Sequence, residues 1–139
     1  MNKTYLKLSL DLDFVLIAIT APLKDYTLCH KINKNLEFDL EKIDDHEVYY
    51  NVDEAPLAFS RYHFFVDEGE IDYYLVNNRN SEGFLIPEMN KVDFFVIIQQ
   101  FIGRDELDFI LNRLNKLPDI QVAAQINPLK LKSKENLVM

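Results

Sequence analysis

The sequence is poor in the residues that form disulfides, phosphate-binding loops and membrane spans. Its one cysteine, Cys29, has no partner for a disulfide within the chain, and this predicts a reducing compartment. Three isolated glycines provide no glycine-rich phosphate loop, and the three histidines lack metal-ligand spacing, so we expect no metal and no cofactor. No apolar run approaches the roughly 20 residues needed to cross a membrane. We therefore expect a cytoplasmic protein without a membrane span, folded as a single domain over residues 1–139.

Positive charge is scarce in the middle of the chain. The net charge is −8, and residues 37–72 carry 12 acidic residues against Lys42 and Arg61, a local balance of −10. Such a segment repels a phosphate backbone, so we expect no nucleic-acid partner, although the lysines of the C-terminal tail leave that possibility as a third hypothesis. The acidic stretch is interpreted as a solvated face, and the alternative is a docking face for a basic partner.

The first half of the chain shows mixed periodicity. Leucines alternate with other residues over 6–12 and predict a strand, whereas the apolar run 14–20 fits a buried helix or a buried strand. A helix is predicted over 21–35, capped by Thr20. Its core-facing stripe consists of Tyr26, Cys29, Ile32 and Leu36. Residues 37–56 are irregular, with a short strand near 38–40.

A hairpin and a long connection follow. Alternation over 62–66 and 71–75 predicts two strands joined by a turn at 67–70, in which Gly69 supplies a positive φ. Residues 77–91 are rich in loop formers and predict a long unstructured connection, which is unusual inside a compact domain and often functional.

The last third predicts a strand, a helix and a strand over 92–126. The first strand is apolar on both faces and therefore central. The helix follows Gly103 and is stopped by Pro118, with an apolar stripe from Leu107 to Leu117. A strand over 120–126 and a loosely held tail over 129–139 follow. Two strands joined by a helix favour a parallel pair. The predicted fold is therefore α+β, with a mixed, mainly antiparallel sheet, helices on one face and this C-terminal strand-helix-strand unit. An exposed edge of such a sheet would allow a homodimer.

The segment Ile86–Phe94, with the sequence IPEMNKVDF, resembles the signature of the bacterial IPExxVDY family at every fixed position except the last, where Phe94 replaces tyrosine. The segments 24–26 and 77–79 and Leu36 are similar to the family more loosely. The resemblance implies a bacterial protein but no particular reaction. The missing hydroxyl indicates that the ring at position 94 packs in the core.

Glu88, Lys91 and Asp93 place two carboxylates and an amine within six residues. Paired carboxylates serve as general acid and base in hydrolases, but a structural role fits as well, because Glu88 can accept hydrogen bonds from loop amides. Asp93 is alone among apolar neighbours and needs a partner such as Arg61, Arg79 or Lys91. We therefore expect no catalytic residues and a non-enzymatic module that binds an unknown protein or small ligand near Glu88, Lys91, Asp93 and Arg79. The alternative is a hydrolase-type enzyme that uses Glu88 and Asp93 with Lys91.

Overall fold

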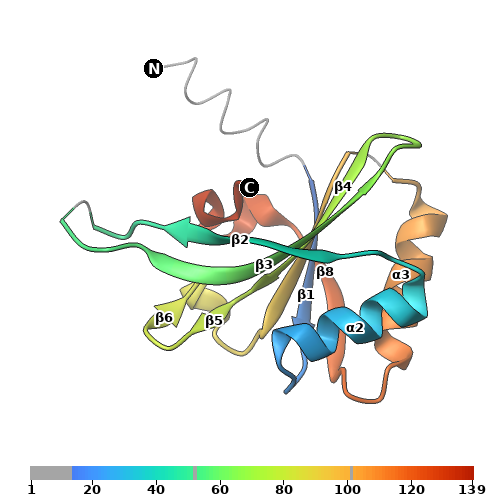
Figure 1. Ribbon diagram of the computed structural model, residues 1–139, viewed down its shortest axis with the longest axis horizontal. Helices are drawn as coiled ribbons and strands as arrows, with labels where there is room; N and C mark the ends of the chain where they lie inside the picture. Colours follow the sequence, from blue (N-terminus) through green and yellow to red (C-terminus); the bar gives the residue numbers. More distant parts are fainter. Residues whose placement is uncertain (1–13, 52, 101) are drawn as a thin grey trace.

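The computed structural model describes residues 14–51, 53–100 and 102–139, and the strand predicted over 6–12 lies outside them. The α+β prediction is confirmed: six strands form one antiparallel sheet in the order β2-β3-β4-β7-β1-β8, accompanied by two α-helices (Figure 1). The six strands are β1 Phe14–Thr20, β2 Glu41–Val48, β3 Leu57–Val66, β4 Ile71–Asn77, β7 Phe94–Gln99 and β8 Val122–Ile126. The apolar run 14–20 is thus a strand, and both its neighbours in the sheet, β7 and β8, run antiparallel to it.

Both helices cover the same face of the sheet, as predicted (Figure 1). Helix α2 (Asp25–Leu36) and helix α3 (Arg104–Lys116) bury one stripe each. The stripes share one core with the inward side chains of the sheet, which include Ile17, Ile19, Tyr73, Leu75, Phe94 and Val96. In α3 the predicted stripe is confirmed at Leu107, Ile110 and Leu114.

Helix α2 begins four residues later than predicted. Thr20 ends β1 and Lys24 occupies the N-cap position, because residues 14–20 are consumed by a central strand and the chain turns at 21–24. The later start rotates the stripe: Leu28 is buried with Cys29, Ile32 and Leu36, whereas Tyr26 is 63% exposed.

The acidic segment 37–56 is more regular than predicted. It contains β2, an eight-residue edge strand paired with β3, rather than a short strand at 38–40. Because β2 lies at the sheet edge and most of its side chains face water, its composition lacks the apolar alternation of a half-buried strand. The hairpin that follows is confirmed, with Val66 opposite Ile71 and positive φ at both Gly69 (85°) and Glu70 (52°).

The second face of the sheet carries its own core, covered by two segments predicted to be loose. The connection 77–91 is ordered: it forms the short strands β5 (Arg79–Asn80) and β6 (Gly83–Phe84) and the 3₁₀ turn η1 (Pro87–Met89). The tail contains two further 3₁₀ turns, η2 (Pro128–Lys130) and η3 (Lys134–Leu137). Leu85, Ile86 and Leu137 are all 0% exposed, so burial of these apolar side chains holds both segments on the sheet.

The C-terminal unit is split. Strands β7 and β8 run parallel to each other but are separated by β1, which is antiparallel to both. The predicted parallel orientation of these two strands is thus confirmed, although they are not neighbours in the sheet. The predicted mixed sheet is corrected, because every neighbouring pair of described strands is antiparallel. Neither of the two described α-helices has the length and apolar character required to cross a bilayer.

Candidate functional site

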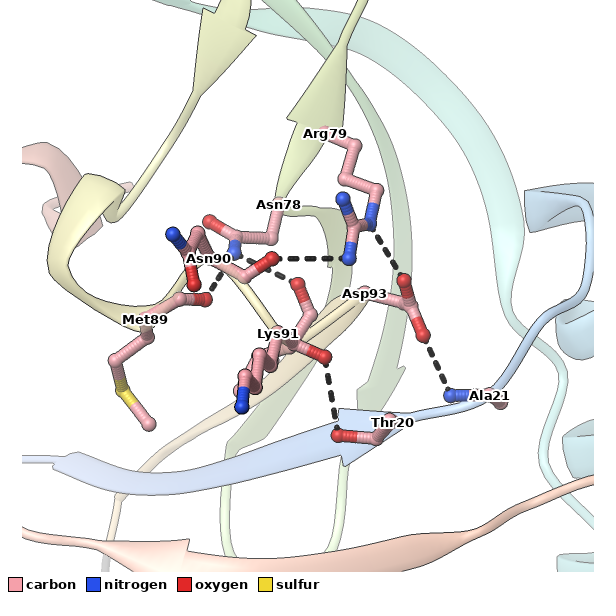
Figure 2. A network of polar contacts seen from close by, with 9 residues as sticks. Thr20, Ala21, Asn78, Arg79, Met89, Asn90, Lys91 and Asp93 are labelled. Atoms are coloured by element: carbon pink, nitrogen blue, oxygen red, sulfur yellow. Dashed lines mark hydrogen bonds and ion pairs between the residues drawn. The ribbon is translucent and has the colours of Figure 1, made fainter.

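Asn78 organises the signature segment from inside the protein. Among the described residues, Asn78 is the one polar residue that is buried, at 0% exposure. Its Nδ2 donates to the carbonyl oxygens of Met89 (2.9 Å) and Val92 (2.8 Å) (Figure 2). Its Oδ1 accepts from the amide of Ile86 (2.8 Å). The loop 86–92 is thus folded around one amide side chain. Sequence reasoning treated Asn78 only as a loop former.

Asp93 connects three parts of the chain at the start of β7. One carboxylate oxygen accepts from the backbone amide of Ala21 (2.8 Å), and the other accepts from Nε of Arg79 (2.6 Å). Arg79 also donates through Nη2 to the carbonyl of Asn90 (2.9 Å), which fixes the guanidinium (Figure 2). The Asp93 side chain is 18% exposed and that of Arg79 is 47% exposed, so the pair is partly shielded from water. The prediction that Asp93 needs a cationic partner is confirmed, with Arg79 in that role.

The other two candidate partners of Asp93 lie elsewhere. Arg61 donates to the carbonyl of Asp44 and contacts the sulfur of Met139. Lys91 is exposed, and its side chain points away from the Arg79–Asp93 pair (Figure 2). Its backbone carbonyl instead accepts from the hydroxyl of Thr20 at 3.4 Å.

Glu88 belongs to a different contact. Its two carboxylate oxygens accept from the amide and the hydroxyl of Ser133, each at 2.8 Å, so it fastens the signature loop to the C-terminal tail. Partial burial would raise the pKa of Glu88, but the hydrogen bonds from Ser133 and from nearby backbone amides outweigh it and hold the pKa below its ordinary value. Glu88 is therefore an ionised structural acceptor with partners distinct from those of Asp93.

Phe94 follows Asp93 and is 2% exposed on the helix-covered side of the sheet. The prediction that this ring packs in the core is confirmed. A tyrosine hydroxyl on the same ring would need a hydrogen-bond partner in that apolar setting.

The Arg79–Asp93 pair lies in an open groove of about 430 Å³. We call it the Asp93 groove; it is lined by residues 21–26, Asn77, Arg79, Asp93 and Phe94. Residues 24–26, Asn77 and Arg79 thus meet Asp93 in one place. Sequence reasoning missed Lys24 and Tyr26 as site residues, because nothing in their spacing connects them to a position some 70 residues away.

The groove offers both charge signs and an exposed ring. Asp25 accepts from the hydroxyl of Tyr62 at 3.0 Å, and burial followed by this contact with Asp25 raises the pKa of Tyr62. Lys24 is exposed and forms no ion pair with a described residue. Lys24 is the N-cap residue of α2 and its side chain makes no capping hydrogen bond, so it leaves the first amides of that helix uncapped. Within the described ranges, no three His, Cys, Asp or Glu side chains are grouped to hold a metal.

Comparison with known proteins adds no relative: no protein-family model and no curated protein matches the sequence. The resemblance to the IPExxVDY family therefore stays a prediction.

Proposed function

We propose that this protein is a non-enzymatic binding module and that its ligand site is the Asp93 groove. One observation carries the proposal: three segments far apart in the sequence meet in an open groove of about 430 Å³, and its polar floor is fixed by the Arg79–Asp93 pair. Binding sites are commonly concave, largely pre-formed and provided with a few fixed polar groups.

The hydrogen bonds of the candidate residues support binding rather than catalysis. Asp93 accepts from a backbone amide and from Arg79, and Glu88 accepts from Ser133. The hydrolase alternative requires Glu88 and Asp93 to converge in one cleft with Lys91 as their neighbour. Only Asp93 of these three lines the groove, and no specific observation favours the alternative.

The free groups of the groove indicate the ligand's chemistry. An acidic group on a small ligand or on a peptide would meet the ammonium of Lys24 and the positive N-terminal end of α2. An attached apolar ring would lie against Tyr26, whose side chain is largely exposed. We therefore infer a carboxylate-bearing ligand with a flat apolar part.

The test is a titration of the isotope-labelled protein with benzoate, hippurate and N-acetylphenylalanine, followed by amide chemical shifts. We expect shifts at residues 21–26 and 77–79, abolished in a Tyr26→Ser, Lys24→Gln double variant. Tyr49→Ser is the matched control, because Tyr49 is 65% exposed and Tyr26 is 63% exposed, and Tyr49 is absent from the groove. Absence of binding by all three probes, or shifts that survive in the double variant, would contradict the assignment.

A homodimer through one of the sheet edges, β2 or β8, and a cytoplasmic location stay predictions. Sedimentation velocity over a hundredfold range of concentration tests the first. The buried Cys29 thiol is compatible with the second.

A further inference from the structure

A second groove lies at the opposite end of α2, outside the signature region. It has a volume of about 480 Å³ and its floor combines Phe38, Phe64, Val66, Ile71 and Tyr73. We call it the Phe38 groove. Figure 1 shows the three parts around it: the end of α2, the turn between β3 and β4, and the start of α3.

The floor is aromatic and only partly covered. The ring of Phe38 lies 5.4 Å from that of Phe64 and 4.6 Å from that of Tyr73, measured between centroids. Tyr73 is buried, whereas Phe38 and Phe64 are half-buried and leave apolar surface in contact with water. An apolar side chain placed in the groove would remove that surface from water.

The rim is acidic on three sides. Glu37 follows α2, Glu68 lies in the β3–β4 turn and Glu106 lies in the first turn of α3. All three are exposed, and none forms an ion pair with a described residue. Glu37 also adopts a left-handed conformation (φ 57°), in which glycine or asparagine would be less strained.

We propose that the Phe38 groove docks a basic peptide segment of a partner protein, with one apolar side chain on the aromatic floor and flanking lysine or arginine side chains at the glutamates. Charge complementarity favours this occupant, because like charges held around an apolar floor repel one another until cations enter between them. The acidic stretch 37–72 of the sequence supplies two of the three rim glutamates and most of the floor. It is therefore more than a solvated face.

The probe is a blocked six-residue peptide with a central leucine–phenylalanine pair and two lysines on each side. The full chain, isotope-labelled, is titrated with this peptide and with the same peptide carrying glutamates in place of lysines. We expect shifts at Phe38, Phe64 and the 67–70 turn with the basic peptide, weakening as salt is raised, and none with the acidic peptide.

Two triple variants separate the groove from general attraction. In the first, glutamine replaces Glu37, Glu68 and Glu106, which removes the ion pairs that these glutamates would form with the lysines of the peptide. Three exposed pairs together predict about tenfold weaker binding. In the second, Glu47→Gln, Asp53→Asn and Glu54→Gln change the net charge equally at exposed positions outside the groove. We expect less than about a twofold loss there, because charges beyond a Debye length are screened.

Three results would overturn the proposal. The first is equal weakening in both triple variants, which means non-specific attraction. The second is a change in the groove's resonances on Lys3→Glu, Lys7→Glu substitution without peptide, which identifies the chain's own N-terminal segment as the occupant. The third is a dependence of those resonances on protein concentration alone, which identifies a second copy.

Discussion

Replacing Asn78 by alanine tests whether the signature loop depends on one buried amide. The substitution removes three side-chain hydrogen bonds to the backbone. The carbonyl of Met89 keeps a second donor, the amide of Val92 at 3.1 Å, but the amide of Ile86 and the carbonyl of Val92 lose the bonds that Asn78 makes with them inside the protein. At about 1.5–2 kcal/mol for each buried group left without a partner, we expect a loss of about 3–4 kcal/mol.

Asn115 provides a matched control. Its side chain also makes three hydrogen bonds to the backbone, to the carbonyls of Leu111 and Ala123 and from the amide of Ala123. Asn115 is exposed and its bonds with Ala123 are only part-buried, so water replaces much of what is lost. Alanine is also the better helix former at this position in α3. We expect Asn115→Ala to cost at most about 1 kcal/mol.

Thermal and urea unfolding of both variants measure the difference. For a domain of this size 1 kcal/mol shifts the midpoint by about 3–5 °C, so Asn78→Ala should lower it by about 9–20 °C and Asn115→Ala by less than about 5 °C. Equal shifts would refute the reasoning, because they would mean that burial adds nothing to the cost of losing these bonds. An Asn78→Asp variant should be no more stable than Asn78→Ala, since a carboxylate cannot donate to the two carbonyls.

Three further predictions are tested by unfolding and by thiol reactivity. Asp93→Asn should lower the stability by about 2 kcal/mol, because it weakens charge-assisted bonds to a backbone amide and to Arg79. Glu88→Gln, at an exposed position, should lower it by less than about 1 kcal/mol. A larger loss for Glu88→Gln than for Asp93→Asn would contradict the assigned partners. Burial, followed by the nearby Asp25 charge, raises the pKa of the Cys29 thiol, so its reaction with a thiol reagent at pH 8 should be much slower than in urea, and equal rates would count against it. Burial lowers the pKa of His46, so the neutral ring is favoured in the folded protein and stability should fall as the pH drops below the unfolded value of about 6.5; His46→Gln should remove that part of the pH dependence.

The elements predicted well are those whose local pattern agrees with their final environment. Helix α3 has one apolar stripe and one sheet to cover, so its periodicity was sufficient. Strand β2 lies at a sheet edge, and its many charged side chains leave no alternation of apolar and polar residues by which a strand could be predicted. The predicted start of α2 is wrong because Thr20 and Pro22 resemble a helix start, while β1 pairs with β7 as far as Ile19 and with β8 as far as Thr20. That pairing involves residues that are distant in the sequence and leaves no local mark.

The candidate site shows the same division. The need of Asp93 for a cation was readable, because a carboxylate in an apolar strand cannot stay unpaired. The role of Asn78 was not, since it stands among other asparagines in the sequence and only its burial distinguishes it. The contact of Glu88 with Ser133 could not be predicted either, because the two residues are 45 positions apart and the C-terminal tail has no periodicity.

The two grooves lie at opposite ends of one helix, and this makes their tests independent. Helix α2 has 12 residues, which at about 1.5 Å each separate its ends by about 18 Å. That distance is about twice the Debye length at physiological salt, so neutralising the glutamates of the Phe38 groove should leave the ammonium of Lys24 in the same potential. A carboxylate ligand should therefore bind the Asp93 groove equally well in the Glu37, Glu68 and Glu106 triple variant, and a basic peptide should bind the Phe38 groove equally well when Lys24 and Tyr26 are replaced. If either substitution weakened the distant ligand, the link would have to pass through the packed stripe of α2 rather than through charge.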